Sequence, residues 1–170
     1  KQVMVPLDGN QFINSGQHRH SQYGKDFIDW YHLSLVAHGK RMLKAADAAL
    51  NGAFATIPLG YKIPGIHWTI AAEDARARSA ELAAGLLHSE WPYQAENGYG
   101  YANMVAVARQ LNHRRRAVVL HFTALEMPDQ PLAPSYSKAK TLVHWLGTEA
   151  KRQQVMIKGE NALAAGIEYA

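Results

Sequence analysis

The feature that most constrains the fold is an alternation of strand-like and helix-like segments along the chain. Residues 117–122, AVVLHF, form an apolar run of the kind found in strands that are covered on both faces of a parallel sheet. Two further strand-like runs lie near Ile57 and Met156. Strands separated by helices pair in parallel through right-handed crossovers. The sequence therefore predicts an α/β fold in which strands near Ile57, Val119 and Met156 are neighbours in that order.

Three segments carry the apolar periodicity of amphipathic helices. They are residues 25–50, 101–112 and 137–153. The side chains expected to face inward are Phe27, Ile28, Tyr31, Leu35, Met42, Ala46 and Leu50 in the first, Met104, Val105, Ala108 and Leu111 in the second, and Leu142, Val143 and Leu146 in the third. Ser137 is the expected N-cap of the third helix. Pro58 and Pro64 limit the first strand, because proline cannot donate to a sheet ladder.

Composition places the chain among soluble globular proteins. Its 170 residues fit one domain with a sizeable core, so we expect residues 1–170 to form a single domain. Hydrophobic residues make up 48% of the chain and charged residues 19%, which is ordinary for a globular protein. The chain has no cysteine, and this excludes disulfides and thiolate metal sites.

The charge pattern does not indicate nucleic acid, a membrane or a metal as partner. The net charge is only +4, and the basic run HRRR at residues 113–116 is short, without interleaved aromatic residues. We expect this run to be a solvated helix end, where cations are favoured. No apolar run approaches membrane-spanning length. His18 and His20 do not share a helix face, so we expect neither a metal site nor a cofactor. The compartment stays open, and secretion is our expectation for a bacterial chain.

Polar side chains follow each predicted strand. Because the carboxyl ends of parallel strands meet at one edge, where such folds carry their chemistry, we expect these side chains to converge. The residues are Lys62, His67 and Trp68 after the first strand, Thr123 and Glu126 after the second, and Glu160 and Asn161 after the third. This set of a cation, an imidazole, a hydroxyl, carboxylates, an amide and an indole suits a polyhydroxylated ligand with an aromatic platform.

Each of these residues also has a purely structural interpretation. Lys62 can be a surface lysine that packs its stem on apolar groups, and His67 a hydrogen-bonded structural histidine. Trp68 can fill core, Glu126 can pair with an arginine, and Glu160 can accept a backbone N–H in a turn. Separate structural roles for all of these residues are less expected than one shared site, because all of them are expected at the same edge of one sheet.

Five separated motifs occur in order along the chain: YGKDFIDWYHLSLVAHG, KIPGIHW, AELAAG, FTALEM and GENAL. Together they resemble the β-amylases, the family 14 glycoside hydrolases. The resemblance spans roughly residues 8–163, which is most of this chain but only part of the family's barrel. It implies a portion of a (β/α)8 TIM barrel with parallel strands alternating with helices, lacking the early strands and the last strand. A complete barrel of this type takes about 250 residues.

The resemblance also implies roles for residues at the strand ends. Glu160 is expected to be the general base that activates water, and Gly159 is expected to let the backbone turn so that this side chain enters the pocket. The residues expected to contact the glucan are Lys62, His67, Thr123, Asn161, Ala162 and Leu163. Two positions depart from the family pattern: Ala124 replaces the usual cysteine, and Thr69 follows Trp68 where plant members have a second tryptophan.

The activity implied is exo-hydrolysis of α-1,4-glucans such as starch and maltodextrin, with release of maltose and inversion of configuration. Inverting glycosidases need a carboxylic acid roughly 6.5–9.5 Å from the base, and no segment here resembles the one that carries the family's acid. The expected partners are therefore an α-1,4-glucan or maltose and the rest of the barrel, in the same or another chain. Two alternatives stay open: a catalytically inactive glucan-binding module, and a half-barrel that works only with a partner chain.

Overall fold

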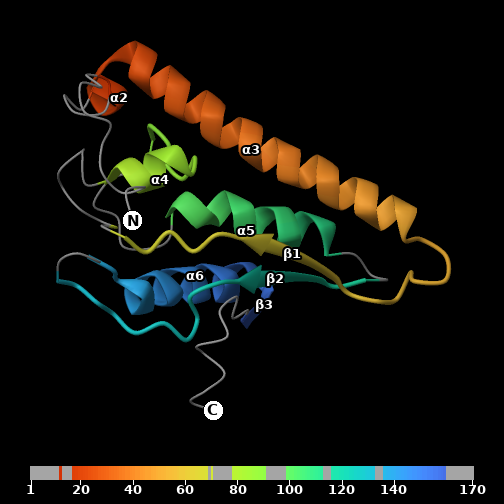
Figure 1. Cartoon of the computed structure of the whole chain (residues 1–170). Coiled ribbons are helices and arrows are strands. Elements are labelled where there is room, and N and C mark those ends of the chain that lie inside the picture. Colours follow the sequence, from red (N-terminus) through yellow and green to blue (C-terminus); the bar gives the residue numbers. More distant parts are fainter. Residues whose placement is uncertain are drawn as a thin grey trace.

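Three short parallel strands form a sheet with one face covered by helices (Figure 1). The computed structural model describes residues 12, 17–68, 70, 78–90, 99–112, 116–132 and 136–159. Strands β1 (Leu59–Ile63), β2 (Val118–Phe122) and β3 (Met156–Gly159) lie in the order β1-β2-β3. The predicted strand order and direction are thus confirmed. Strand β1 fits between Pro58 and Pro64, which bound it on either side.

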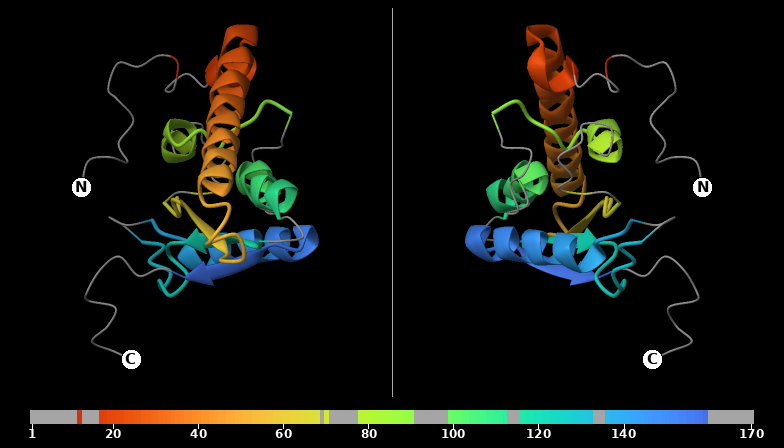
Figure 2. Two further views of the ribbon diagram at one scale, coloured as in Figure 1. Left: turned by 90° about the vertical axis from the view of Figure 1, so that its right-hand side faces the viewer. Right: turned by 90° about the vertical axis from the view of Figure 1, so that its left-hand side faces the viewer.

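Helices alternate with the strands, as the sequence predicts. The helices are α2 (Gln17–His20), α3 (Gln22–Ala49), α4 (Ser79–Ala83), α5 (Tyr99–Leu111) and α6 (Ala139–Gln153). Helix α5 contacts β2, α6 contacts β3, and the two helices pack on each other on the same side of the sheet (Figure 2). Helix α3 packs against α5. In the described part of the chain, no helix combines the length and the apolar character needed to cross a membrane.

The main core fills the space between the sheet and helices α5 and α6. Strand β2 contributes three side chains that are at most 2% exposed: Val118, Leu120 and Phe122. Helix α5 contributes Val105, Ala108 and Leu111, and α6 contributes Leu142 and Leu146. The inward faces predicted for these two helices are confirmed. Apolar burial of this kind contributes roughly 1.5–3 kcal/mol for each large side chain.

The inward face predicted for α3 is wrong in part. Ile28 is buried, but Leu35 and Met42 are 37% and 57% exposed. The positions that turn inward instead include Leu43 and His32. The imidazole of His32 is tolerated there because both ring nitrogens have hydrogen-bond partners, and a buried polar group is tolerated when it is hydrogen-bonded. Apolar periodicity alone does not reveal such a residue.

Ser137 does not cap α6, so this sequence prediction is wrong. The helix begins at Ala139, and its N-cap, Lys138, makes no side-chain hydrogen bond there. Instead, Ser137 forms a short antiparallel bridge with Gln130, with hydrogen bonds of 2.8 and 3.0 Å between their backbones. The carboxylate of Asp129 accepts a hydrogen bond from the backbone nitrogen of Lys140. The hydroxyl of Ser137 is therefore available for another contact.

Arg116 is not part of a solvated helix end, contrary to the sequence prediction for the HRRR run. The other three residues of that run lie outside the described residues. Arg116 is 4% exposed, and its guanidinium donates to the carbonyl oxygens of Leu50 and Phe54 at 2.7 and 2.9 Å. Oδ1 of Asp47 lies 3.4 Å from Nε of Arg116. A cation is favoured here because the carbonyls at a helix C-terminus carry partial negative charge.

Candidate functional site

The sheet face that points away from the helices carries a row of basic side chains. Residues alternate between the faces of a strand, and Tyr61 and Ile63 pack into the core, so Lys62 lies on the opposite face. Its partner in register is His121, and the next along the row is Lys158. The ring of His121 leans over Gly60, where an added Cβ would lie 2.8 Å from Nε2. Lys62 and Lys158 are exposed. Exposure is expected for the inner face of a barrel when only a portion of the barrel is present.

His67 lies just beyond the carboxyl end of β1 and is buried. Its Nδ1 lies 2.7 Å from Oγ of Ser137, and its carbonyl oxygen accepts a hydrogen bond of 2.8 Å from the backbone nitrogen of Lys138. The ring also packs on Trp68, with centroids 3.9 Å apart. Desolvation lowers the pKa of His67 below its ordinary value. The imidazole is therefore neutral at neutral pH and carries one donor and one acceptor nitrogen.

Thr123 joins the loop after β2 to the loop after β1. Its Oγ1 accepts a hydrogen bond of 2.9 Å from the backbone nitrogen of Gly65. A Cβ added at Gly65 would lie 3.0 Å from that oxygen and 3.2 Å from Cβ of Ala124, so glycine allows the two loops to approach closely. Ala124 itself adopts a positive φ of 73°, an uncommon conformation for a residue with a side chain.

Tyr101, a residue not predicted from the sequence to belong to the site, supports the same loop from helix α5. Its hydroxyl donates to the carbonyl oxygen of Pro64 at 3.0 Å and accepts from the backbone nitrogen of Ile66 at 2.9 Å. Burial raises the pKa of this phenol above its ordinary value, so the proton that makes the donor bond is retained. The ring meets Phe122 edge to face. A tyrosine on the inward face of a helix, in the register of Val105 and Ala108, is the only signal for it in the sequence.

Strand β3 brings the chain to the neighbourhood of these loops. Gly159 is in register with Phe122, and a Cβ added at Gly159 would lie 2.9 Å from Cδ1 of Leu125. The structure thus shows Gly159 in close packing at the end of the strand. The turn expected after it lies outside the described residues and stays a prediction. Four predicted site residues, Glu160, Asn161, Ala162 and Leu163, lie outside the described residues.

The structure therefore brings three of the predicted site residues to one end of the sheet. Lys62 lies in β1, and His67 and Thr123 lie in adjoining loops that Gly65 links. Trp68 is half-buried and bridges to Ser137, while Glu126 is exposed. Among the residues that the structure describes, no group of three or more His, Asp and Glu side chains is arranged to hold a metal ion. The absence of a metal site stays a prediction.

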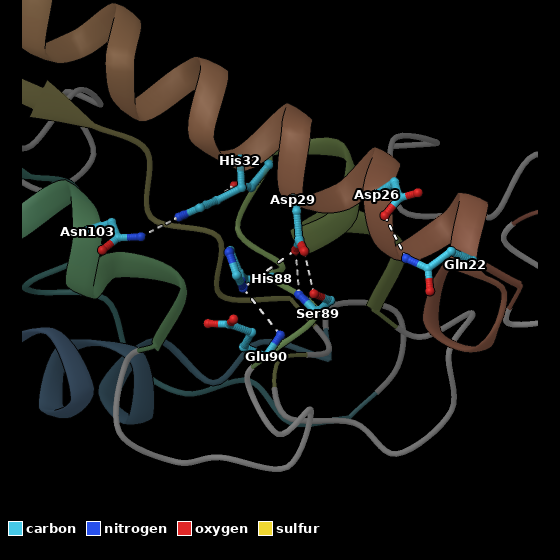
Figure 3. Close-up of polar contacts among 9 residues, drawn as sticks. Gln22, Asp26, Asp29, His32, His88, Ser89, Glu90 and Asn103 are labelled. Atoms are coloured by element: carbon cyan, nitrogen blue, oxygen red, sulfur yellow. Dashed lines mark hydrogen bonds and ion pairs between the residues drawn. The ribbon is translucent and has the colours of Figure 1, made fainter.

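A second polar cluster, not predicted from the sequence, joins α3 to the segment after α4 and to α5 (Figure 3). Nδ1 of His32 lies 2.7 Å from the carbonyl oxygen of Gly85, so this nitrogen carries the proton. Nε2 then accepts a hydrogen bond of 3.0 Å from the side-chain amide of Asn103. Desolvation by burial lowers the pKa of His32, which keeps the ring neutral.

Asp29 forms the second half of this cluster. Its carboxylate accepts hydrogen bonds from the backbone nitrogen of Ser89, at 2.6 Å, and from the hydroxyl of Ser89. Nδ1 of His88 lies 3.5 Å from the same carboxylate, and the rings of His88 and His32 meet edge to face. Figure 3 shows these side chains converging between the helix and the loop. The cluster ties the loop to α3.

Parallel strands that alternate with helices are the architecture of a portion of a (β/α)8-barrel protein. The sequence pattern of the family described as Glycosyl hydrolase family 14 matches residues 1–168. The chain belongs to that family. The predicted fold, a portion of the barrel, is confirmed: the described strands form an open sheet of three rather than a closed barrel.

Individual relatives agree with this assignment. The chain is 32% identical to a β-amylase of Bacillus cereus, in an alignment that covers 98% of this chain. It is 33% identical to a β-amylase of Cytobacillus firmus, in an alignment that covers 97% of this chain. The crystal structure of the catalytic domain of β-amylase from Paenibacillus polymyxa matches 93% of the chain with a TM-score of 0.69 and 30% identity. The chain spans 27% and 31% of the two relatives' lengths and 33% of that structure.

Proposed function

We propose that this chain is part of a β-amylase-type exo-hydrolase that cleaves α-1,4-glucans and releases maltose with inversion of configuration. The observation that carries the proposal is that Lys62, His67 and Thr123 all lie at or just beyond the carboxyl ends of two neighbouring parallel strands, whose following loops are joined by the hydrogen bond between Thr123 and Gly65. The third strand is the neighbour of the second and leads directly into Glu160 in the sequence. The names of the relatives, all β-amylases, support the same substrate class.

In this proposal Glu160 is the general base that activates the attacking water. The row of basic residues fits this role, because a cation that came within about 4–6 Å of the Glu160 carboxylate would keep it ionised. Lys158, two positions before Glu160 in the sequence, and Lys62 belong to that row. The glucan contacts are made by Lys62, His67, Thr123, Asn161, Ala162 and Leu163. Uncharged donors and acceptors among them orient sugar hydroxyls without competing for the catalytic proton.

The general acid of the proposed pair comes from another part of the barrel. An inverting pair needs an acid opposite the base, and the chain covers only about a third of its solved relative. Within the described sheet, β1 and β3 each have a single neighbour, β2. Open strand edges pair with other segments unless they are covered. The rest of the barrel is the partner that fits both requirements.

The test measures release of reducing sugar from soluble starch, together with the anomeric form of the product by proton NMR. The chain alone should be inactive. Addition of the barrel segment that carries the acid glutamate, taken from the Bacillus cereus relative, should produce β-maltose, the inverted product. The same mixture with Glu160→Gln is the control and should stay inactive. Maltose release by the chain alone would contradict the assignment of the acid to another segment, and the α-anomer would contradict inversion.

The two alternatives, an inactive glucan-binding module and a half-barrel that needs a partner chain, predict different experimental results. A glucan-binding module should bind maltose in a calorimetric titration without ever hydrolysing starch. A half-barrel that works with a partner chain is favoured by large apolar side chains left exposed on α3: Tyr23, Trp30 and Met42 are 73%, 63% and 57% exposed. In that case the barrel segment should raise the thermal stability of the chain even in the absence of sugar, since a partner that binds the folded state stabilises it.

A further inference from the structure

We propose that Ser137 is a positioning residue for His67: its hydroxyl holds Nδ1 of the imidazole, so that the ring presents Nε2 to the sugar. This inference rests on the proposed role of His67 in binding glucan. It assigns a role in the site to a segment just before α6, about 70 residues beyond His67 in the sequence.

The contact is close, and both partners are held in place. Nδ1 of His67 and Oγ of Ser137 are 2.7 Å apart, and the two residues are 4% and 3% exposed. The backbone of Ser137 is fixed by two hydrogen bonds to Gln130, and the backbone nitrogen of Lys138 donates to the carbonyl oxygen of His67 at 2.8 Å. Trp68 bridges to Ser137 as well. The hydroxyl therefore reaches the ring from a fixed position.

The hydroxyl has no part in capping the helix that follows it. Helix α6 is capped without it, and Asp129 accepts the hydrogen bond of Lys140. A serine hydroxyl at 3% exposure must satisfy its polar group inside the protein, because an unpaired buried hydroxyl costs free energy. The imidazole of His67 is the partner that the structure provides.

The chemistry follows from the two nitrogens of a neutral imidazole. One nitrogen is a donor and the other an acceptor, and the hydrogen bond at one of them determines how the ring is oriented. When Ser137 engages Nδ1, a half-turn of the ring about its bond to Cβ breaks that hydrogen bond. Nε2 is then the nitrogen left for a sugar hydroxyl. Without the hydroxyl, both ring orientations are open and part of the population presents the wrong nitrogen.

The test uses the full chain and three variants: Ser137→Ala, Ser137→Thr as the conservative replacement, and Ser34→Ala as the matched control, a serine of α3 outside this contact. The 15N chemical shifts of the His67 ring are recorded, and maltose is titrated into each protein. Ser137→Ala should shift the Nδ1 resonance by several times more than Nε2 and weaken maltose binding about three- to tenfold, the range for one hydrogen bond. Ser137→Thr should restore both readings, and Ser34→Ala should change neither.

The two readings separate this inference from the proposed function. An unchanged Nδ1 resonance in a folded Ser137→Ala protein overturns the inference, whether or not the chain binds maltose. A selective shift of Nδ1 together with unchanged maltose affinity also overturns it, because the ring then needs no positioning to bind sugar. If the wild-type chain shows no maltose binding, the proposed sugar site fails, and the ring resonances alone decide whether Ser137 holds His67. Circular dichroism establishes that each variant is folded.

Discussion

The backbone nitrogen of Gly65 donates a hydrogen bond to the hydroxyl oxygen of Thr123 at a distance of 2.9 Å. This bond joins the loops that follow β1 and β2, and it places Thr123 next to the segment that carries His67. Replacing Thr123 by valine keeps the shape of the side chain but leaves the Gly65 N–H without its acceptor. We expect Thr123→Val to lower the free energy of unfolding by about 1–3 kcal/mol, measured by urea denaturation.

The matched control for this prediction is Thr123→Ser. Serine keeps the hydroxyl and removes only a methyl group, so this variant should lose less stability than Thr123→Val. If the two variants are equally stable, the hydroxyl does not hold the two loops together and the methyl group accounts for the effect.

Two helical glycines should respond in opposite ways to substitution by alanine. At Gly100, in the first turn of α5, an added Cβ would lie 2.6 Å from the carbonyl oxygen of Leu86. At Gly147, in α6, an added Cβ would meet no described atom within 4 Å beyond the adjacent helix backbone. Gly100→Ala should destabilise the chain by about 1–3 kcal/mol through overpacking. Gly147→Ala should stabilise it by about 0.5–1 kcal/mol, the difference in helix propensity. Thermal unfolding of both variants checks this, and a stabilising Gly100→Ala would contradict the packing of α5 on that loop.

Stability should fall as the pH falls below about 6.5 because buried histidines resist protonation. Burial lowers the pKa values of His18, His32 and His67 in the folded chain below the ordinary value of 6.5. The unfolded chain therefore binds more protons in the window between the folded pKa values and 6.5, so the free energy of unfolding rises with pH there. Each such group contributes a slope of up to about 1.4 kcal/mol per pH unit. Urea midpoints measured from pH 8 to pH 5 report the effect.

Variants of α3 identify one source of this pH dependence. His32→Gln removes a titrating group from the cluster with Asn103 and Asp29 (Figure 3), and its stability should depend less steeply on pH than that of the wild type. His38→Gln, which removes an exposed histidine of the same helix, is the matched control. Equal slopes in all three proteins would show that His32 takes up its proton as easily in the folded chain as in the unfolded one.

Arg116 should be one of the most sensitive charged residues of the chain. Its guanidinium is buried and donates to the carbonyl oxygens of Leu50 and Phe54. Hydrogen bonds to charged groups contribute about 1.5–3 kcal/mol each, so Arg116→Met should lower the free energy of unfolding by about 2–4 kcal/mol. Arg109→Met, at an exposed position of α5, should change it by less than about 0.5 kcal/mol. Similar values for both variants would contradict the buried role of Arg116.

Much of the fold could be predicted from the sequence because its signals are local. The apolar run that becomes β2, the two prolines that bound β1, and the spacing of Val105, Ala108 and Leu111 each act within a few residues. The contacts that were missed join residues far apart in the chain. His32 reaches Asn103 and Ser137 reaches His67, and a hydrogen bond between distant side chains leaves no periodicity in the sequence. Serine is also a preferred residue type at a helix N-cap, so the local sequence predicted that Ser137 caps α6. In the structure its hydroxyl contacts the distant His67 instead.

The candidate site divides in the same way. Lys62, His67 and Thr123 could be placed at one edge from the rule that the ends of parallel strands meet. Tyr101, which holds the loop before His67, could not, because a buried tyrosine of a helix resembles any other core residue. The positions of Glu160 and its neighbours lie outside the described residues, so their roles stay predictions.

The most direct test of the account is the effect of Glu160→Gln on catalysis and on sugar binding in the same assembled protein. The substitution keeps the size and hydrogen bonding of the side chain but removes the charge that a general base needs. Turnover of starch by the chain combined with the acid-bearing barrel segment should fall by about 10²- to 10⁴-fold, the range for loss of general acid–base catalysis, while the maltose dissociation constant should change by less than about threefold. A variant that retains a tenth of the wild-type turnover would contradict the account, because another carboxylate would then be activating the water.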